Sequence, residues 1–242
     1  MLFTIITVTL NSEKTIQKTI NSINKQTFKN FEYIIIDGGS SDETIKVIKK
    51  IIRKKYKLIS EKDSGIYNAM NKGIKMSKGK YVAFLNSDDW FNNNTLLDMS
   101  IFIKHKKPEI IYGDAVFFKD KKKSFYAKAK LQNLENTMSL LHSSFYIKSK
   151  IIKKYLFDEN LQISSDYKQM IELKKKYKFN YYSKSLSNVA MGGKSSNLLL
   201  SSSEFFLIQK KNFGVNKAIL NYSIKYHYHT IKILYLFIKN FF

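Results

Sequence analysis

The chain has 242 residues, enough for one catalytic-sized domain with a single core and a short appendage. Its apolar fraction of 44% and aromatic fraction of 14% exclude a disordered chain. It contains no cysteine, which excludes disulfides and thiolate metal sites. The first residues lack a basic leader, and no apolar run reaches the roughly 20 residues of a spanning helix. We therefore expect a cytosolic or peripheral protein.

The formal net charge of +23 raises the question of a nucleic-acid partner. The 42 basic residues include one arginine, Arg53, and arginine is the side chain suited to bidentate contacts with phosphates and bases. No nucleic-acid reader motif is present. We expect no nucleic-acid partner, and interpret the charge as a solvated lysine surface or as a surface attracted to anionic lipid or diphosphate groups.

The first half of the chain alternates between strand and helix patterns. Repeated units of this kind predict a mainly parallel sheet with helices on both faces. Ligands bind beyond the carboxyl ends of such strands, so Asp37, Asp63 and Asp88, which each follow a strand, are expected on one rim. Strands are expected at residues 2–10, 32–37, 57–60 and 80–85, and helices up to about 26, from 41 or 42 to about 55, at 65–77 and at about 94–103.

The second half is less regular. Strands are expected at residues 109–118, 124–128 and 180–189, and helices at 149–155 and 165–177. From about residue 202 the pattern is helical and rich in aromatic residues and lysines. No internal repeat or Pro/Gly-rich linker is visible, so we expect one domain over residues 1–200 and a helical tail over 201–242.

Two adjacent carboxylates, Asp88 and Asp89, lie in the longest stretch without Lys or Arg, residues 81–103. Adjacent carboxylates repel each other unless a cation or hydrogen-bond donors compensate. A hard divalent ion such as Mg²⁺ or Mn²⁺ takes one or two protein carboxylates and completes its shell with phosphate and water. The alternative is that both residues cap the helix expected at about 94–103.

Asp37 ends a buried strand and precedes Gly38-Gly39-Ser40-Ser41. Its carboxylate can shape an Asx-type turn, or can accept a hydrogen bond from the N–H of a uracil or thymine base. The first strand is followed by Asn11-Ser12-Glu13 and not by a glycine fingerprint, which argues against a dinucleotide-binding fold.

Five segments share a recognisable order and spacing, and they cover nearly the whole first half: residues 4–11, 26–28, 32–44, 60–73 and 79–89. Together they resemble the family 2 inverting glycosyltransferases with the GT-A fold, and are similar to bacterial enzymes of O-antigen, capsule and exopolysaccharide synthesis. The resemblance implies an α/β fold with a mostly parallel central sheet flanked by helices. It also implies a nucleotide-sugar-binding half over residues 1–100 and an acceptor-binding half over 101–200.

The resemblance implies roles for the acidic residues. Asp37 is expected at the base, Asp63 at a second nucleoside contact, Asp88 at the ribose or the metal, and Asp89 at a Mn²⁺ or Mg²⁺ ion beside the diphosphate. Asn86 stands where relatives often have an aspartate, so the ribose contact stays open between Asn86 and Asp88. The full set of expected nucleotide-sugar contacts is Thr9, Leu10, Asn11, Glu13, Asp37, Asp63, Asn71, Asn86, Asp88 and Lys194.

Residues 163–167 resemble the acidic motif of the family, which makes Asp166 the expected catalytic base. The alternative is a carboxylate favoured by a helix N-terminus. Residues 192–196, with Lys194, match a mobile loop that closes over the donor. His142 falls at a recurrent family position and is a candidate for the acceptor side, although a lone histidine is more often structural. Leu10 stands where many relatives have an aromatic residue, and no arginine lies near Met70.

The resemblance implies a metal-dependent hexosyl- or N-acetylhexosaminyltransferase. The expected donor is a UDP-sugar, with thymine and guanine nucleotides left open. The expected acceptor is a glycan hydroxyl, on a polyprenyl-diphosphate-linked oligosaccharide at the inner face of the bacterial cytoplasmic membrane. The tail is either a helix packed on the domain or an interfacial anchor. Two other classes stay open: a nucleotidyltransferase-like enzyme, and a basic lipid- or nucleic-acid-binding protein without catalysis.

Overall fold

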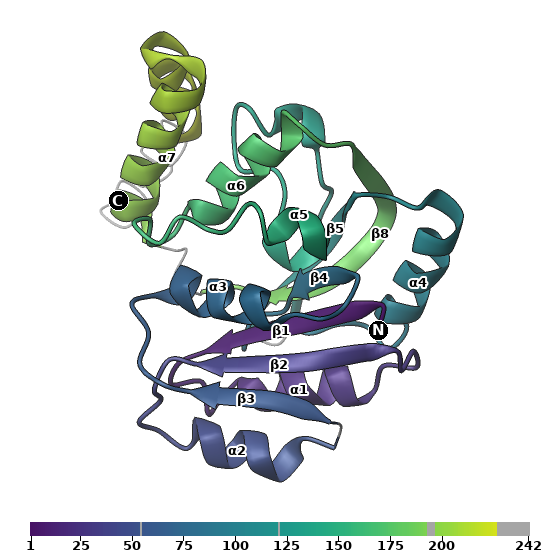
Figure 1. Ribbon diagram of the computed structural model, residues 1–242. Helices are drawn as coiled ribbons and strands as arrows, with labels where there is room; N and C mark the ends of the chain where they lie inside the picture. The colour runs from purple at the N-terminus through teal and green to yellow at the C-terminus, as the bar shows by residue number, and fades with distance from the viewer. Residues whose placement is uncertain (54, 121, 193–196, 227–242) are drawn as a thin grey trace.

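The computed structural model describes residues 1–53, 55–120, 122–192 and 197–226 (Figure 1). Its centre is a sheet of eight strands in the order β3-β2-β1-β4-β7-β5-β6, with β8 paired to β5. The strands are β1 (Phe3–Thr9), β2 (Phe31–Asp37), β3 (Tyr56–Ser60), β4 (Tyr81–Phe84), β5 (Ile110–Lys119), β6 (Lys122–Ala127), β7 (Phe145–Lys148) and β8 (Phe179–Ala190).

The four strands of the first half run parallel, as the alternating pattern predicts. β1 is buried along its whole length, which is typical of a strand covered on both faces. The register pairs Thr9 with Asp37 and Asp37 with Ser60, so the carboxyl ends of β1, β2 and β3 lie in line. The three arrowheads point to the same side in Figure 1.

Helices cover both faces of this sheet (Figure 1). One apolar cluster joins the sheet to α3, α6 and α7, and a second joins its other face to α1, α2 and α4. The helices are α1 (Ile16–Asn24), α2 (Thr44–Ile51), α3 (Ile66–Met76), α4 (Thr95–Lys106), α5 (Ser149–Ile152), α6 (Ser165–Lys174) and α7 (Leu198–Phe213). Two short 3-10 helices are η1 (Leu131–Asn133) and η2 (His142–Ser144).

The second half extends the sheet with an element that the sequence pattern does not predict. β7 pairs antiparallel with both β4 and β5 and so joins the two halves of the sheet. β8 runs parallel to β5, and Asn188 on β8 forms a bridge back to Trp90, just beyond β4. This bridge brings the end of β8 against the turn that carries Asp88 and Asp89.

The C-terminal part of the described chain is helical. α7 begins at Leu198, so that it spans the boundary expected at residue 200, and ends at Phe213, with Gly214, whose φ is 86°, at its C-cap. Residues 215–226 form a further helix. Within the described residues, no helix is long and apolar enough to cross a membrane. The expected anchor at residues 231–242 lies outside the described part of the chain.

Candidate active site

The buried carboxylate of Asp37 is held by four hydrogen bonds. Its Oδ2 accepts from the backbone N–H groups of Gly39 (3.1 Å) and Ser40 (3.0 Å) and from the Ser60 hydroxyl (2.7 Å). Its Oδ1 accepts from the Ser40 hydroxyl at 2.5 Å. The interpretation of Asp37 as a turn-shaping carboxylate is confirmed, and its contact with a base stays a prediction.

The loop after β1 is tied to the turn after β2. Asn11, with φ of 50°, donates its backbone N–H to the Ser40 hydroxyl at 2.8 Å, and its side-chain oxygen accepts from Ser41 N at 2.9 Å. Glu13 accepts from Glu43 N, at the start of α2, at 3.0 Å. Asn11 and Glu13 therefore fix the shape of this rim, and Leu10 between β1 and Asn11 is 42% exposed.

Asp63 lies against the same rim. Its Oδ1 accepts from the Gly65 N–H at 3.0 Å. Its Oδ2 lies 2.5 Å from the position that a Cβ on Gly38 would occupy. Any side chain at residue 38 would displace the Asp63 carboxylate, so Gly38 keeps the room that brings Asp63 beside the end of β2.

The turn of residues 86–89 is held from two sides. The Ser87 hydroxyl lies 2.9 Å from that of Ser12, beyond β1. Thr19 of α1 donates its hydroxyl to the carbonyl oxygen of Asp89 at 2.7 Å. The N-cap of α4 is Asn94. Asp88 and Asp89 are therefore not its caps, and the metal site stays a prediction.

Asp89 is 3% exposed, and its Oδ1 accepts from the Ala190 N–H of β8 at 3.1 Å. Burial, together with the neighbouring negative charge of Asp88, raises the pKa of Asp89 to about 8. Burial raises the pKa of Asp88 as well. A bound cation would offset both effects by stabilising the ionised carboxylates.

The described residues contain no group of three His, Cys, Asp or Glu side chains placed to hold a metal. A protein that encloses an ion by itself needs such a group, whereas Mg²⁺ at a nucleotide takes one or two carboxylates and the substrate's phosphates. The adjacent, under-compensated carboxylates of Asp88 and Asp89 fit the second kind of site.

Two buried side-chain oxygens at this rim, Thr9 Oγ1 and Asn86 Oδ1, have no hydrogen-bond partner within the described structure. Buried polar atoms are paired as a rule, because leaving one unpaired costs about 1–3 kcal/mol. Both residues are expected nucleotide-sugar contacts. Their unpaired oxygens are consistent with a ligand that completes the site.

One imidazole connects this turn to the second half of the chain. His142 Nε2 lies 3.0 Å from Asn86 Nδ2, and His142 Nδ1 lies 3.0 Å from Asp166 Oδ2. Asp166 Oδ1 accepts from Tyr167 N at 2.8 Å. The Tyr67 hydroxyl lies 3.2 Å from the same oxygen and donates at 2.5 Å to the carbonyl oxygen of Ile163. The structure therefore brings together the predicted base, the predicted acceptor-side histidine and the predicted metal turn.

The charges around His142 raise its pKa, and its two contacts fit the tautomer in which Nδ1–H donates to Asp166 and Nε2 accepts from the Asn86 amide. Burial lowers the pKa of the imidazole, but the hydrogen bond to Asp166 and the charges of Asp166, Asp89 and Asp88 raise it more, so that the net shift is upward. Burial and the charge of Asp166 raise the pKa of the Tyr67 hydroxyl, which stays a hydrogen-bond donor. Asp166 is thus surrounded by donors.

One expected nucleotide-sugar contact, Asn71, is engaged by the protein itself. Asn71 is 2% exposed, and its amide bonds the backbone of Phe157 in both directions at 2.9 Å and Glu159 Oε1 at 2.8 Å. It ties α3 to the segment before α6, with both its amide oxygen and its amide nitrogen paired. Lys194 lies outside the described residues.

Sequence reasoning missed several residues that build the site, namely Ser12, Thr19, Tyr67 and Ser87. Tyr67 lies within the matching segment at residues 60–73, and its place two residues after Asp-Ser-Gly is the one signal available. The sequence pattern gives no sign that Ser12, Thr19 and Ser87 belong to the site, because their hydrogen-bond partners are 65 or more positions away in the chain.

Comparison with known proteins identifies the family. The family model described as "Glycosyl transferase family 2" matches residues 4–170. The chain is 32% identical over 120 residues to the PGL/p-HBAD biosynthesis glycosyltransferase of Mycobacterium bovis, covering 48% of this chain and 47% of that protein. It is 33% identical over 116 residues to the poly(ribitol-phosphate) beta-N-acetylglucosaminyltransferase TarS of Staphylococcus aureus, covering 46% of this chain and 20% of TarS.

The fold agrees with solved structures. A crystal structure of S. aureus TarS 1–349 in complex with UDP-GlcNAc superposes with a TM-score of 0.70 and 23% identity, covering 86% of this chain and 64% of that one. The mannosyltransferase PcManGT from Pyrobaculum calidifontis, in complex with GDP-Man and Mn²⁺, superposes with a TM-score of 0.64 and 11% identity, covering 90% and 73%.

The chain therefore belongs to glycosyl transferase family 2, and its fold is GT-A. It spans about half the length of the mycobacterial relative and a fifth of TarS. The expected fold class is confirmed.

The electrostatics of Asp89 predict a pH-dependent stability. In the unfolded chain Asp89 loses its proton near pKa 3.8, whereas the folded protein holds it until about pH 8. Without divalent cations, Tm should therefore fall as pH rises through this window, by about 2–4 °C for each kcal/mol lost. Mn²⁺ should reverse the fall at pH 8. Thermal unfolding in EDTA and in Mn²⁺ at pH 5 and pH 8 measures both effects.

Asp89→Asn should remove both the pH dependence and the response to Mn²⁺, because the amide is neutral at every pH. Asp120→Asn, the same change at an exposed turn between β5 and β6, is the matched control and should keep both. An Asp89→Asn variant with the wild-type Mn²⁺ response would place the cation elsewhere.

Proposed function

We propose that the chain catalyses inverting transfer of a sugar from a nucleotide diphosphate sugar, with UDP as the expected nucleotide, to a hydroxyl of a glycan acceptor. The observation that carries this proposal is the His142 bridge, which joins Asn86 of the acidic turn to Asp166 through two 3.0 Å contacts. An inverting displacement needs a base on one side of the anomeric carbon and a stabilised diphosphate on the other.

Asp166 is the proposed base. An ionised carboxylate has about four lone-pair sites, and two of those of Asp166 accept from Tyr167 N and His142. A free site can accept the proton of the acceptor hydroxyl as that oxygen attacks the anomeric carbon and the bond to the diphosphate breaks. His142 and Tyr167 N, one on each carboxylate oxygen, hold the orientation of the carboxylate.

Asp88 and Asp89 are the residues that would hold a divalent ion, with Asp89 as the firmer ligand. Such an ion supplies Lewis-acid stabilisation to the departing diphosphate. The ribose contact stays open between Asn86 and Asp88. Thr9 Oγ1 and Asn86 Oδ1, the unpaired oxygens of the rim, are available to the donor.

The base pocket is proposed around the turn after β2. Asp37 is enclosed by its own turn, whereas Asp63 is half-buried beside Gly38. Asp37, which also shapes the loop, keeps its proposed contact with the N–H of a uracil, and Asp63 is the proposed second nucleoside contact. The TarS structures in complex with UDP-GlcNAc and with UDP support a uridine nucleotide for this chain.

The acceptor is proposed to bind in the second half. A cavity of about 350 Å³ opens between the β5–β6 hairpin and residues 138–141, directly before His142. Its lining combines the rings of Phe117 and Phe125, stacked with centroids 4.6 Å apart, with Lys128 and Lys130. Such a lining suits a sugar that carries phosphate, as in the proposed polyprenyl-diphosphate-linked acceptor.

A membrane-surface location is proposed from the charge and the C-terminal helices. The helix at residues 215–226 carries several exposed apolar side chains as well as two lysines, Lys217 and Lys225. Basic amphipathic helices with this composition lie in the interface of anionic membranes. The exposed apolar side chains of residues 215–226 include Val215, Ile219, Leu220 and Ile224, which are 47–66% exposed.

The donor is tested by a screen of nucleotide sugars against the whole chain with Mn²⁺. UDP-sugars should raise Tm and be hydrolysed slowly, whereas CMP- and ADP-sugars should do neither. Stabilisation by every nucleotide alike, without hydrolysis or transfer, would instead indicate a polyanion-binding surface.

The proposed base is tested by Asp166→Asn. The variant should bind UDP with the wild-type Kd but transfer sugar about 10²–10⁴-fold more slowly, because the amide cannot take the proton. Glu172→Gln, the same chemical change on the same helix, should transfer at the wild-type rate. Full transfer by Asp166→Asn would remove Asp166 from the mechanism.

Membrane binding is tested by removing residues 227–242. Asn221 bonds Gln209 at 2.9 Å, and a cut after Tyr226 keeps both residues. The whole chain should sediment with phosphatidylglycerol vesicles and be released by salt, and the shortened chain should bind them more weakly. Equal binding by both would assign the attraction to residues 215–226 and the lysine surface, and no binding by either would refute the proposed location.

A further inference from the structure

Glu204 of α7 stands out by its place in the sequence. It is the sole acidic residue in residues 173–242, a segment rich in lysine. A carboxylate in such a segment is expected to pair with a lysine at the surface. Glu204 is instead 6% exposed, on the face of α7 that packs against the rest of the protein.

The partners of Glu204 are three consecutive backbone N–H groups. Its Oε1 accepts from Gln162 N at 2.6 Å, and its Oε2 accepts from Ile163 N at 3.0 Å and Ser164 N at 2.8 Å. These residues lead directly into α6, whose first turn carries Asp166. The Ser164 side chain makes no capping hydrogen bond there, so the carboxylate of α7 fixes the entry to this helix.

A second contact links the same two helices. Gln209, further along α7 than Glu204, donates its amide to the Tyr167 hydroxyl at 2.5 Å. Tyr167 follows Asp166, and its backbone N–H donates to the Asp166 carboxylate. The rings of Tyr167 and Phe205 stack with their centroids 5.5 Å apart. Contacts from α7 therefore hold the chain before and after Asp166.

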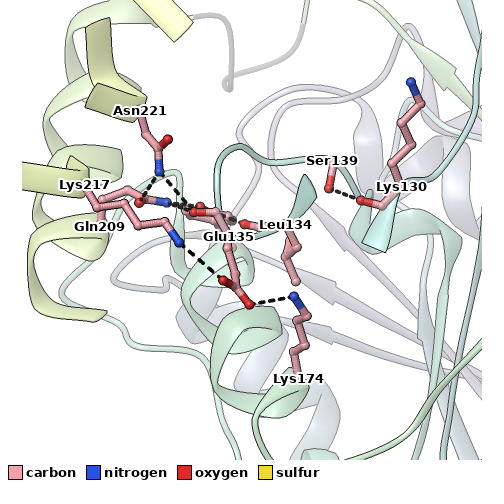
Figure 2. Close-up of polar contacts among 9 residues, drawn as sticks. Lys130, Leu134, Glu135, Ser139, Lys174, Gln209, Lys217 and Asn221 are labelled. Carbon is pink, nitrogen blue, oxygen red and sulfur yellow. Dashed lines mark hydrogen bonds and ion pairs between the residues drawn. The ribbon is translucent and has the colours of Figure 1, made fainter. Parts of the chain in front are cut away.

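The C-terminal helices are held in place by a polar cluster around Glu135 (Figure 2). Its carboxylate pairs with Lys174 of α6 at 2.8 Å and with Lys217 at 3.4 Å. Its backbone oxygen accepts from Gln209 at 2.9 Å and from Asn221 at 3.3 Å. This cluster fixes α7 against α6 and so holds the Glu204 carboxylate within hydrogen-bonding distance of the N–H groups of residues 162–164.

We propose that α7 is part of the catalytic unit and that Glu204 is a positioning residue that sets the orientation of Asp166. The proposal rests on the proposed role of Asp166 as the base. Three backbone groups bound to one carboxylate leave the segment little freedom, and a displacement of about 1 Å at a catalytic group can lower the rate about 10²-fold.

Glu204→Gln tests the proposal, because the side chain keeps its size but turns one oxygen into a donor facing an N–H group. The variant should lose kcat about 10- to 100-fold. KM for the nucleotide sugar and Kd for UDP should stay within about two-fold of wild type. The reason is that the proposed donor contacts Thr9, Asn86 and Asp88 lie at the ends of the parallel strands, and none of them belongs to α7. Hydrogen exchange of the backbone amides of residues 162–164 should become faster.

Ile208→Ala is the matched control, since Ile208 is 4% exposed on the same helix and packs only in the core. It should lower Tm at least as much as Glu204→Gln, yet keep kcat at a temperature well below unfolding. Equal kcat losses at equal Tm losses would make Glu204 a merely structural residue. Wild-type kcat in Glu204→Gln with faster exchange at residues 162–164 would also overturn the proposal.

The two proposals fail in different ways. If the wild-type protein transfers no sugar, the proposed function fails, and the exchange at residues 162–164 still reports whether Glu204 fixes this segment. If the wild type transfers sugar and Asp166→Asn does not, but Glu204→Gln is fully active, the positioning role alone is wrong.

Discussion

The site depends on one bridging side chain. His142 lies between Asn86, at the carboxyl end of the parallel sheet, and Asp166, at the start of α6. These residues come from different halves of the chain, and β7, which begins directly after the 3-10 helix that starts at His142, is the strand that joins those halves. The antiparallel insertion of β7 is therefore what sets the distance between the proposed metal turn and the proposed base.

Much of the first half could be predicted from the sequence because its strands are buried on both faces. Continuous apolar runs such as Phe3–Thr9 have one stable placement, between two layers of helices. The carboxyl ends of parallel strands share one edge, so their acidic residues gather without further information. The same reasoning could not find β7, because four residues between a 3-10 helix and α5 carry no periodic pattern.

Roles that depend on tertiary partners could not be predicted. Asn71 was expected at the nucleotide, yet its amide is used up by Phe157 and Glu159, more than 80 residues away. For Asp88 and Asp89 the sequence allows a helix cap or a metal site; Asn94 at the N-cap excludes the first, and the second stays a prediction. Glu204 carried a usable signal, as a lone carboxylate among lysines, but its partners are backbone groups that no sequence pattern marks.

The distribution of charge gives these contacts a common cause. No lysine in the described part of the chain is among the buried residues, so buried carboxylates must find other donors. Glu204 is satisfied by backbone N–H groups, Asp37 by N–H and hydroxyl groups, and Asp166 by an N–H and an imidazole. For Asp89 the described residues supply one N–H group, that of Ala190, and its pKa rises accordingly. The least compensated carboxylate therefore lies where a nucleotide-bound cation would stabilise it most.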